Sequence, residues 1–180
     1  TGVDLFFVIS GFVMAYSTAE LQAWRDAKRF LQRRFWRVVP PFWVVCFLFL
    51  PFAATMGNPL TSRSLINAIT FLPVMVNGPY VPPPLVVGWT LVFELVFYLI
   101  VASFIVFPIR RHRGLLILAV TAGLAALGAL GPGGFLCNPL LGEFSLGIGV
   151  YLIWRQSPPR RLQAPLLAIG TVLLIVSAMR

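Results

Sequence analysis

An ionisable residue lies in the middle of an apolar stretch, "GWTLVFELVFYL", at residues 88–99. The acid is Glu94, and Thr90 and Tyr98 lie four residues before and after it, so a helix would place all three on one face. A charged side chain at the centre of a bilayer costs about 2.5–3.5 kcal/mol on insertion scales. Glu94 is therefore a candidate for acid–base chemistry or for a proton relay, with a hydrogen-bonded structural role as the alternative.

Two further acids lie in apolar segments. Asp4 lies near the start of the chain, and Glu143 lies in "NPLLGEFSLGIG". Around Glu143, the small residues Gly142, Ser145 and Gly149 form one helical face that permits close approach of a neighbouring helix. Three acids in such segments exceed what a passive bundle requires. All three are candidate functional residues, although a structural role remains the alternative for Glu143.

The composition indicates the surroundings of these acids. The chain is 59% hydrophobic and 11% charged, with a mean hydropathy of +0.91, whereas soluble domains are about 25% charged. Six apolar runs approach the roughly 20 residues that cross a bilayer as a helix. They cover residues 3–19, 38–56, 86–107, 114–131, 135–154 and 163–179. We predict an all-α, polytopic bundle of about six transmembrane helices, in one integral membrane domain over residues 1–180.

The net charge of +9 is compatible with nucleic-acid binding, but its distribution favours another explanation. Twelve of the 14 Lys and Arg residues lie in alternate loops, which is the pattern of cytoplasmic loops in membrane proteins. They are Arg25, Lys28, Arg29, Arg33, Arg34, Arg37, Arg110, Arg111, Arg113, Arg155, Arg160 and Arg161. We therefore predict that the loops 20–37, 108–113 and 155–162 are cytoplasmic and that 57–85 is external. The expected partner is the lipid bilayer, not nucleic acid.

The connections between the apolar runs contain several prolines. Pro40 and Pro41 are expected to open the second span, because the first helical turn tolerates a missing backbone N–H. The longest connection is external, at 57–84, and its apolar centre, 65–76, is too short to span comfortably. We expect that centre to lie in the membrane interface or to re-enter the membrane, with a plain connector as the alternative.

The residues that commonly bind metals are sparse. The two cysteines, Cys46 and Cys137, are far apart in the sequence, and the single histidine, His112, lies in the basic loop "RRHR". This spacing matches no zinc motif. We expect no metal site, two packing cysteines, and a histidine at the level of the lipid headgroups.

Four arginines recur every four residues before the second span, at Arg25, Arg29, Arg33 and Arg37. A helix would place them along one face. A basic amphipathic helix of this kind commonly lies on anionic headgroups. The alternative is that some of these arginines bind a phosphorylated cytosolic cofactor, because guanidinium groups match phosphate oxygens bidentately.

Four motifs are spread over most of the chain. They are "GVDLFFVISGFVM" (2–14), "RRFWRVVPPFW" (33–43), "WTLVFELVFYL" (89–99) and "NPLLGEFSLGI" (138–148). In their order and spacing, these motifs resemble the membrane-bound acyltransferase family 3. Bacterial members of that family O-acetylate exopolysaccharide, O-antigen and nodulation sugars, and the form "WTL..E..FY" looks most like the exopolysaccharide branch.

The resemblance implies an enzyme of the bacterial inner membrane that transfers an acetyl group directly from cytoplasmic acetyl-CoA to a sugar hydroxyl. It implies a supporting catalytic role for Glu94. The family's presumed catalytic histidine lies in a helix before the first motif, and we expect that helix and several later ones to lie outside this chain, which would then be inactive alone. Candidates for sugar binding are Asp4, Trp89, Thr90, Tyr98 and Glu143; candidates for CoA binding are Arg33, Arg34 and Arg37.

Two other functional classes remain open. Intramembrane acids and proline-interrupted helices also occur in secondary transporters, although the chain shows no inverted repeat. The second class is an inactive relative of the enzyme that acts only as a scaffold in polysaccharide export. The export machinery is also a candidate partner of an active enzyme.

Overall fold

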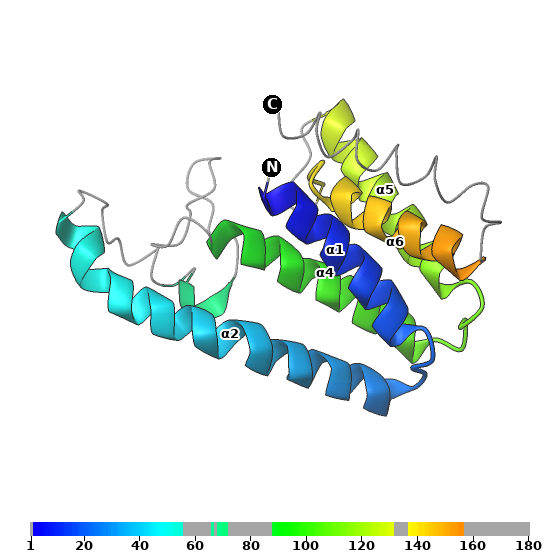
Figure 1. Cartoon of the computed structure of the whole chain (residues 1–180), viewed down its shortest axis with the longest axis horizontal. Helices are drawn as coiled ribbons and strands as arrows, with labels where there is room; N and C mark the ends of the chain where they lie inside the picture. The colour runs from blue at the N-terminus through cyan, green and yellow to red at the C-terminus, as the bar shows by residue number, and fades with distance from the viewer. Residues whose placement is uncertain (1, 56–65, 67, 72–87, 132–136, 157–180) are drawn as a thin grey trace. The chain divides into compact units, whose positions relative to one another are not determined.

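A computed structural model of the chain describes residues 2–55, 66, 68–71, 88–131 and 137–156. All regular elements in these ranges are helical, which confirms the all-α prediction for this part of the chain. The chain divides into two compact units: Thr1–Trp24 with Ser103–Arg180, and Arg25–Ala102. The principal helices, shown in Figure 1, are α1 (Gly2–Thr18), α2 (Trp24–Thr55), α4 (Gly88–Val106), α5 (Arg113–Leu130) and α6 (Leu141–Arg155).

Two of these helices are long and apolar enough to cross a membrane. They are α4, with a mean hydropathy of 2.2, and α5, with 1.9. Helix α1 is also apolar, but its 17 residues make it shorter than these two helices. The predicted runs 38–56 and 135–154 coincide with helical structure in α2 and α6, while 163–179 lies outside the described residues. The total of six spans therefore stays a prediction.

Helix α2 corrects the expected start of the second span. It runs unbroken for 32 residues and contains Pro40, Pro41 and Pro51, so the first two prolines do not open a helix. Proline has no N–H, and each one leaves a carbonyl four residues earlier without its usual helical donor. Tertiary contacts support the helix beyond the prolines, since Phe42 and Cys46 pack on Ala68.

Most of the external segment, including most of its apolar centre, lies outside the described residues. The described part, Ile66 and 68–71, contains helical residues. Trp43 Nε1 donates a hydrogen bond to the carbonyl of Ala68 at 3.2 Å, and the rings of Phe42 and Phe71 lie 5.1 Å apart. These contacts place residues 68–71 against α2; whether the apolar centre of the segment lies in the membrane interface stays a prediction.

Within the first unit, α6 packs against both α1 and α5 (Figure 1). The contact with α1 depends on two glycines. A Cβ atom added to Gly147 would lie 2.8 Å from the backbone nitrogen of Phe12, and one added to Gly11 would lie 3.0 Å from the carbonyl carbon of Phe144. Side chains at these positions would force the backbones apart, so the glycines set the distance between α1 and α6.

The opposite contact of α6 uses the small-residue face expected from the sequence. Gly142 and Gly149 lie beside side chains of α5, and Ser145 Oγ lies 2.7 Å from Thr121 Oγ1. Both hydroxyls are buried, and each also lies within hydrogen-bond distance of a carbonyl of its own helix, so one hydroxyl donates to the other while the second donates to its carbonyl. The prediction of a close helix approach at this face is confirmed.

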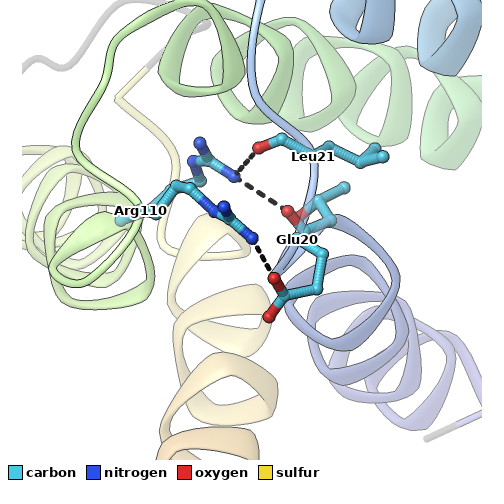
Figure 2. Close-up of polar contacts among 5 residues, drawn as sticks. Glu20, Leu21 and Arg110 are labelled. Carbon is cyan, nitrogen blue, oxygen red and sulfur yellow. Dashed lines mark hydrogen bonds and ion pairs between the residues drawn. The ribbon is translucent and has the colours of Figure 1, made fainter.

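A buried arginine connects the ends of three helices in the same unit. Arg113 Nη1 donates to the carbonyl of Thr18 at 2.8 Å and to that of Leu21, while its Nε donates to the carbonyl of Phe104 at 3.0 Å. Figure 2 shows the carbonyl of Leu21 accepting such a bond, beside the exposed ion pair of Glu20 and Arg110. Arg113 thus satisfies carbonyls at and after helix ends that have no partner within their own helix.

Candidate functional site

The polar face predicted on α4 lies in the protein interior. Thr90 and Glu94 are each 5% exposed, and Tyr98 is 2% exposed. The phenol hydroxyl of Tyr98 donates a hydrogen bond to Oε1 of Glu94. Lipid offers no partner to a carboxyl group, so burial against protein is the arrangement that a membrane helix requires for this residue.

Helix α2 contributes a cation to the same place. The guanidinium carbon of Arg34 lies 5.5 Å from the ring centroid of Tyr98 and 5.7 Å from that of Phe30. The two rings meet edge to face, with centroids 6.0 Å apart. Both cation–ring distances fall within the roughly 6 Å at which a cation is attracted to an aromatic face.

Glu94, Tyr98, Phe30 and Arg34 therefore form one group, which we call the Glu94 cluster. All four belong to the unit Arg25–Ala102. Arg34 and Arg37 both act electrostatically on the Glu94 carboxyl group. The cluster combines a buried carboxyl group, a hydroxyl donor and a cation, a combination suited to holding a polar group in a fixed orientation.

The three arginines predicted to bind CoA occupy different environments. Arg33 and Arg37 are exposed, as are Arg25 and Arg29, so the predicted basic face of α2 is present. Arg34 is partly buried and lies over the two rings instead. Helical spacing explains the division, because Arg34 lies one turn after the buried Phe30, whereas Arg33 and Arg37 lie one turn apart on the exposed side.

Trp89 has a separate environment from the Glu94 cluster. Its side chain is partly buried, and its ring packs edge to face on Phe93 with centroids 6.2 Å apart. This contact joins neighbouring turns of α4 and gives the indole a packing role there. A role in sugar binding for Trp89 stays a prediction.

Asp4 and Glu143, also predicted to bind sugar, belong to the other unit. They come from α1 and α6, and their side chains lie close enough for a hydrogen bond between the two carboxyl groups. Oε2 of Glu143 is buried and has no hydrogen-bond partner among the described residues. The five sugar-binding candidates and Glu94 thus divide between a pair of acids in one unit and residues of α4 in the other.

The sequence did not indicate three features of the structure: the burial of Arg113, the close packing at Gly11 and Gly147, and the contact of Arg34 with two rings. Arg113 was expected to be a basic loop residue, but its side chain is 3% exposed. The spacing of Arg34 from Phe30 was the available signal for the cation over the rings. Among the described residues, no group of three His, Cys, Asp or Glu side chains is arranged to hold a metal ion.

Comparison with known proteins gives a consistent set of matches. A sequence profile of an acyltransferase domain matches residues 1–179. The exopolysaccharide production protein ExoZ of Rhizobium meliloti (strain 1021) is 30% identical over 187 residues, covering 98% of this chain and 56% of ExoZ. BcsY of Komagataeibacter xylinus, a candidate membrane-bound transacylase, is 31% identical over 180 residues, covering 88% of this chain and 46% of BcsY.

The chain spans about half the length of these curated relatives. No solved structure matches it.

Proposed function

Because this chain belongs to the acyltransferase family whose domain profile matches residues 1–179, we propose that it forms part of a membrane O-acyltransferase. The proposed reaction moves an acetyl group from cytoplasmic acetyl-CoA to a hydroxyl of a cell-surface or exported sugar. The names of the relatives support the class of acceptor, since ExoZ is an exopolysaccharide production protein. The buried Glu94 cluster is the structural observation that carries the proposal.

The chemistry of acyl transfer requires a group like this one. The sugar oxygen attacks the thioester carbonyl carbon while a base takes the hydroxyl proton; the carbon–sulfur bond then breaks, and CoA leaves with its thiolate taking up that proton. A carboxylate accepts hydrogen bonds at two oxygens. Tyr98 uses Oε1 of Glu94, and we propose that the second oxygen accepts from the sugar hydroxyl or from the N–H of a histidine base.

The exposed arginines of α2 suit the donor. Arg33 and Arg37 present guanidinium groups to the surroundings, and such groups bind phosphate oxygens bidentately. We therefore propose that they bind the phosphates of acetyl-CoA.

The proposed location is the bacterial inner membrane, with polysaccharide export machinery as a candidate partner. The basic loops predict that the arginines of α2 face the cytoplasm, where acetyl-CoA is present. The family match favours this enzyme over the transporter that the sequence left open.

The direct test uses membrane vesicles that contain the full-length protein, labelled acetyl-CoA and the polysaccharide of the host cell. We expect label to enter the polysaccharide as an ester, which mild alkali releases. Vesicles lacking the protein supply the background. Absence of alkali-labile label above that background would contradict the proposed function.

Donor binding is measured separately in the purified protein by calorimetric titration with CoA. The double variant Arg33→Gln/Arg37→Gln should bind CoA more weakly than the wild type. Unchanged CoA affinity in that variant would contradict the assignment of these arginines.

A further inference from the structure

Arg34 differs from the arginines around it in what its side chain contacts. It belongs to the basic motif "RRFWRVVPPFW", yet its guanidinium group lies over the rings of Phe30 and Tyr98. Arg33 and Arg37, in the same motif, are exposed. A residue engaged with two rings beside a buried acid is poorly placed to bind the phosphates of a soluble donor.

We propose that Arg34 is a positioning residue for the Glu94–Tyr98 pair, and that the phosphates of the donor bind to other residues. The proposal rests on the function proposed above, because it assigns a role within the same site. Arg34 acts through Tyr98: the cation holds the ring, and the ring directs its hydroxyl to Glu94.

The geometry explains why the tyrosine needs this support. Tyr98 and Glu94 lie four residues apart on α4, and their hydrogen bond requires a particular orientation of both side chains. Phe30 meets the Tyr98 ring from α2 with an interplanar angle of 84°. Arg34, one turn further along α2, covers the same ring from 5.5 Å. Two side chains of α2 thus fix a ring of α4.

The chemistry explains why the positioning residue is an arginine. A planar guanidinium group stacks on an aromatic face and retains a charge that does not titrate in the physiological range. The same charge acts favourably on the Glu94 carboxyl group. Lysine would preserve the charge but not the planar contact. Arg34→Lys should therefore be impaired if the planar contact is needed, and active if a positive charge is sufficient.

The kinetic test compares two donors, acetyl-CoA and acetyl-3′-dephospho-CoA, in vesicles that contain the full-length protein. For Arg34→Gln and Arg34→Lys, we expect kcat to fall about tenfold, the range for losing a cation–ring contact shielded from water. The KM for acetyl-CoA should stay within about twofold of wild type, as it does when uniform donor binding is retained. The wild-type preference between the two donors should also be retained. Arg25→Lys, an exposed arginine of the same helix, is the matched control.

A second measurement does not depend on activity. Carbon labelling at the phenol ζ position gives each tyrosine its own resonance, and the Tyr98 signal is the one lost in Tyr98→Phe. We expect Arg34→Gln to shift the Tyr98 signal and Arg25→Lys to leave it in place. The resonance should shift because the variant removes the guanidinium group that lies over the Tyr98 ring.

The outcomes separate this inference from the function on which it rests. If Arg34→Gln abolishes the preference for acetyl-CoA over its dephospho form, or leaves the Tyr98 resonance unchanged, Arg34 is not a positioning residue. If wild-type vesicles transfer no acetyl group from either donor while Arg34→Gln still shifts the Tyr98 resonance, the proposed reaction fails. The structural link from Arg34 to Tyr98 is supported in that case.

Discussion

Tyr98 donates a hydrogen bond to Oε1 of Glu94, one helical turn away on α4, and both side chains are buried. The acid is therefore held by a partner on its own helix, and a cation from α2 covers that partner's ring. A carboxyl group that only had to be tolerated in an apolar environment would need the hydrogen bond alone. The additional cation, close to the exposed arginines of the same helix, supports a functional role for the cluster.

Replacing Tyr98 by Phe keeps the ring and removes the hydroxyl. We expect a loss of stability of about 1–3 kcal/mol, because a buried acceptor then lacks its donor. Acetyl transfer should fall further than the amount of folded protein does. Thermal unfolding in detergent and acetylation per folded molecule are the two measurements. If both stay at the wild-type value, the hydrogen bond has no role in either property.

Replacing Arg113 by Gln removes a buried guanidinium group that donates to three carbonyls. We expect a loss of about 3 kcal/mol or more, because hydrogen bonds from charged groups contribute roughly 1.5–3 kcal/mol each and do not add fully. Arg111→Gln is the matched control, since Arg111 is exposed in the same loop. The measurement is the unfolding temperature in detergent. Equal temperatures for the two variants would contradict the role assigned to Arg113.

Replacing Gly147 by Ala places a Cβ atom against the backbone of α1. Overpacking of this kind costs about 1–3 kcal/mol, so we expect less folded protein in the membrane. Gly123→Ala is the control, because an added Cβ there meets nothing within 4 Å. That variant should be neutral or slightly stabilising, by up to about 1 kcal/mol. Folded protein is measured by size-exclusion chromatography after detergent extraction, and equal yields for the two variants would contradict the packing account.

Features that depend on spacing within one helix were predictable from the sequence. The face formed by Thr90, Glu94 and Tyr98 follows from intervals of four residues, and the small-residue face of Gly142, Ser145 and Gly149 follows from the same geometry. Burial also followed from chemistry, because a carboxyl group in an apolar helix needs a partner within the protein.

Features that depend on contacts between helices were not predictable in the same way. Arg113 sits among basic loop residues, and only the positions of three carbonyls show why it is buried. Pro40 and Pro41 suggested a helix start because proline is tolerated in the first turn of a helix and disfavoured in its interior. Packing of Phe42 and Cys46 supports α2 beyond them, which no local pattern indicates.

The predicted topology can be tested with single cysteines after the native cysteines of the full-length protein, including Cys46 and Cys137, are replaced by Ala. A cysteine at Arg111 should resist an impermeant thiol reagent in intact cells, because the 108–113 loop is expected in the cytoplasm. A cysteine at Asn77, in the predicted external segment, should react. Permeabilised cells supply the control, in which both positions should be labelled. Labelling of Arg111→Cys in intact cells would overturn the topology.

Acetylation by Glu94→Gln tests the central claim most directly. The change keeps the size of the side chain and removes its ability to ionise, while Glu20→Gln makes the same change at an exposed acid. We predict that Glu94→Gln loses about 100-fold or more of the acetyl transfer per folded molecule, as expected for a group that assists proton transfer. The amount of protein in the membrane should be unchanged, and Glu20→Gln should be fully active. Near-normal acetylation by Glu94→Gln would contradict the account and leave Glu94 a structural hydrogen-bond acceptor for Tyr98.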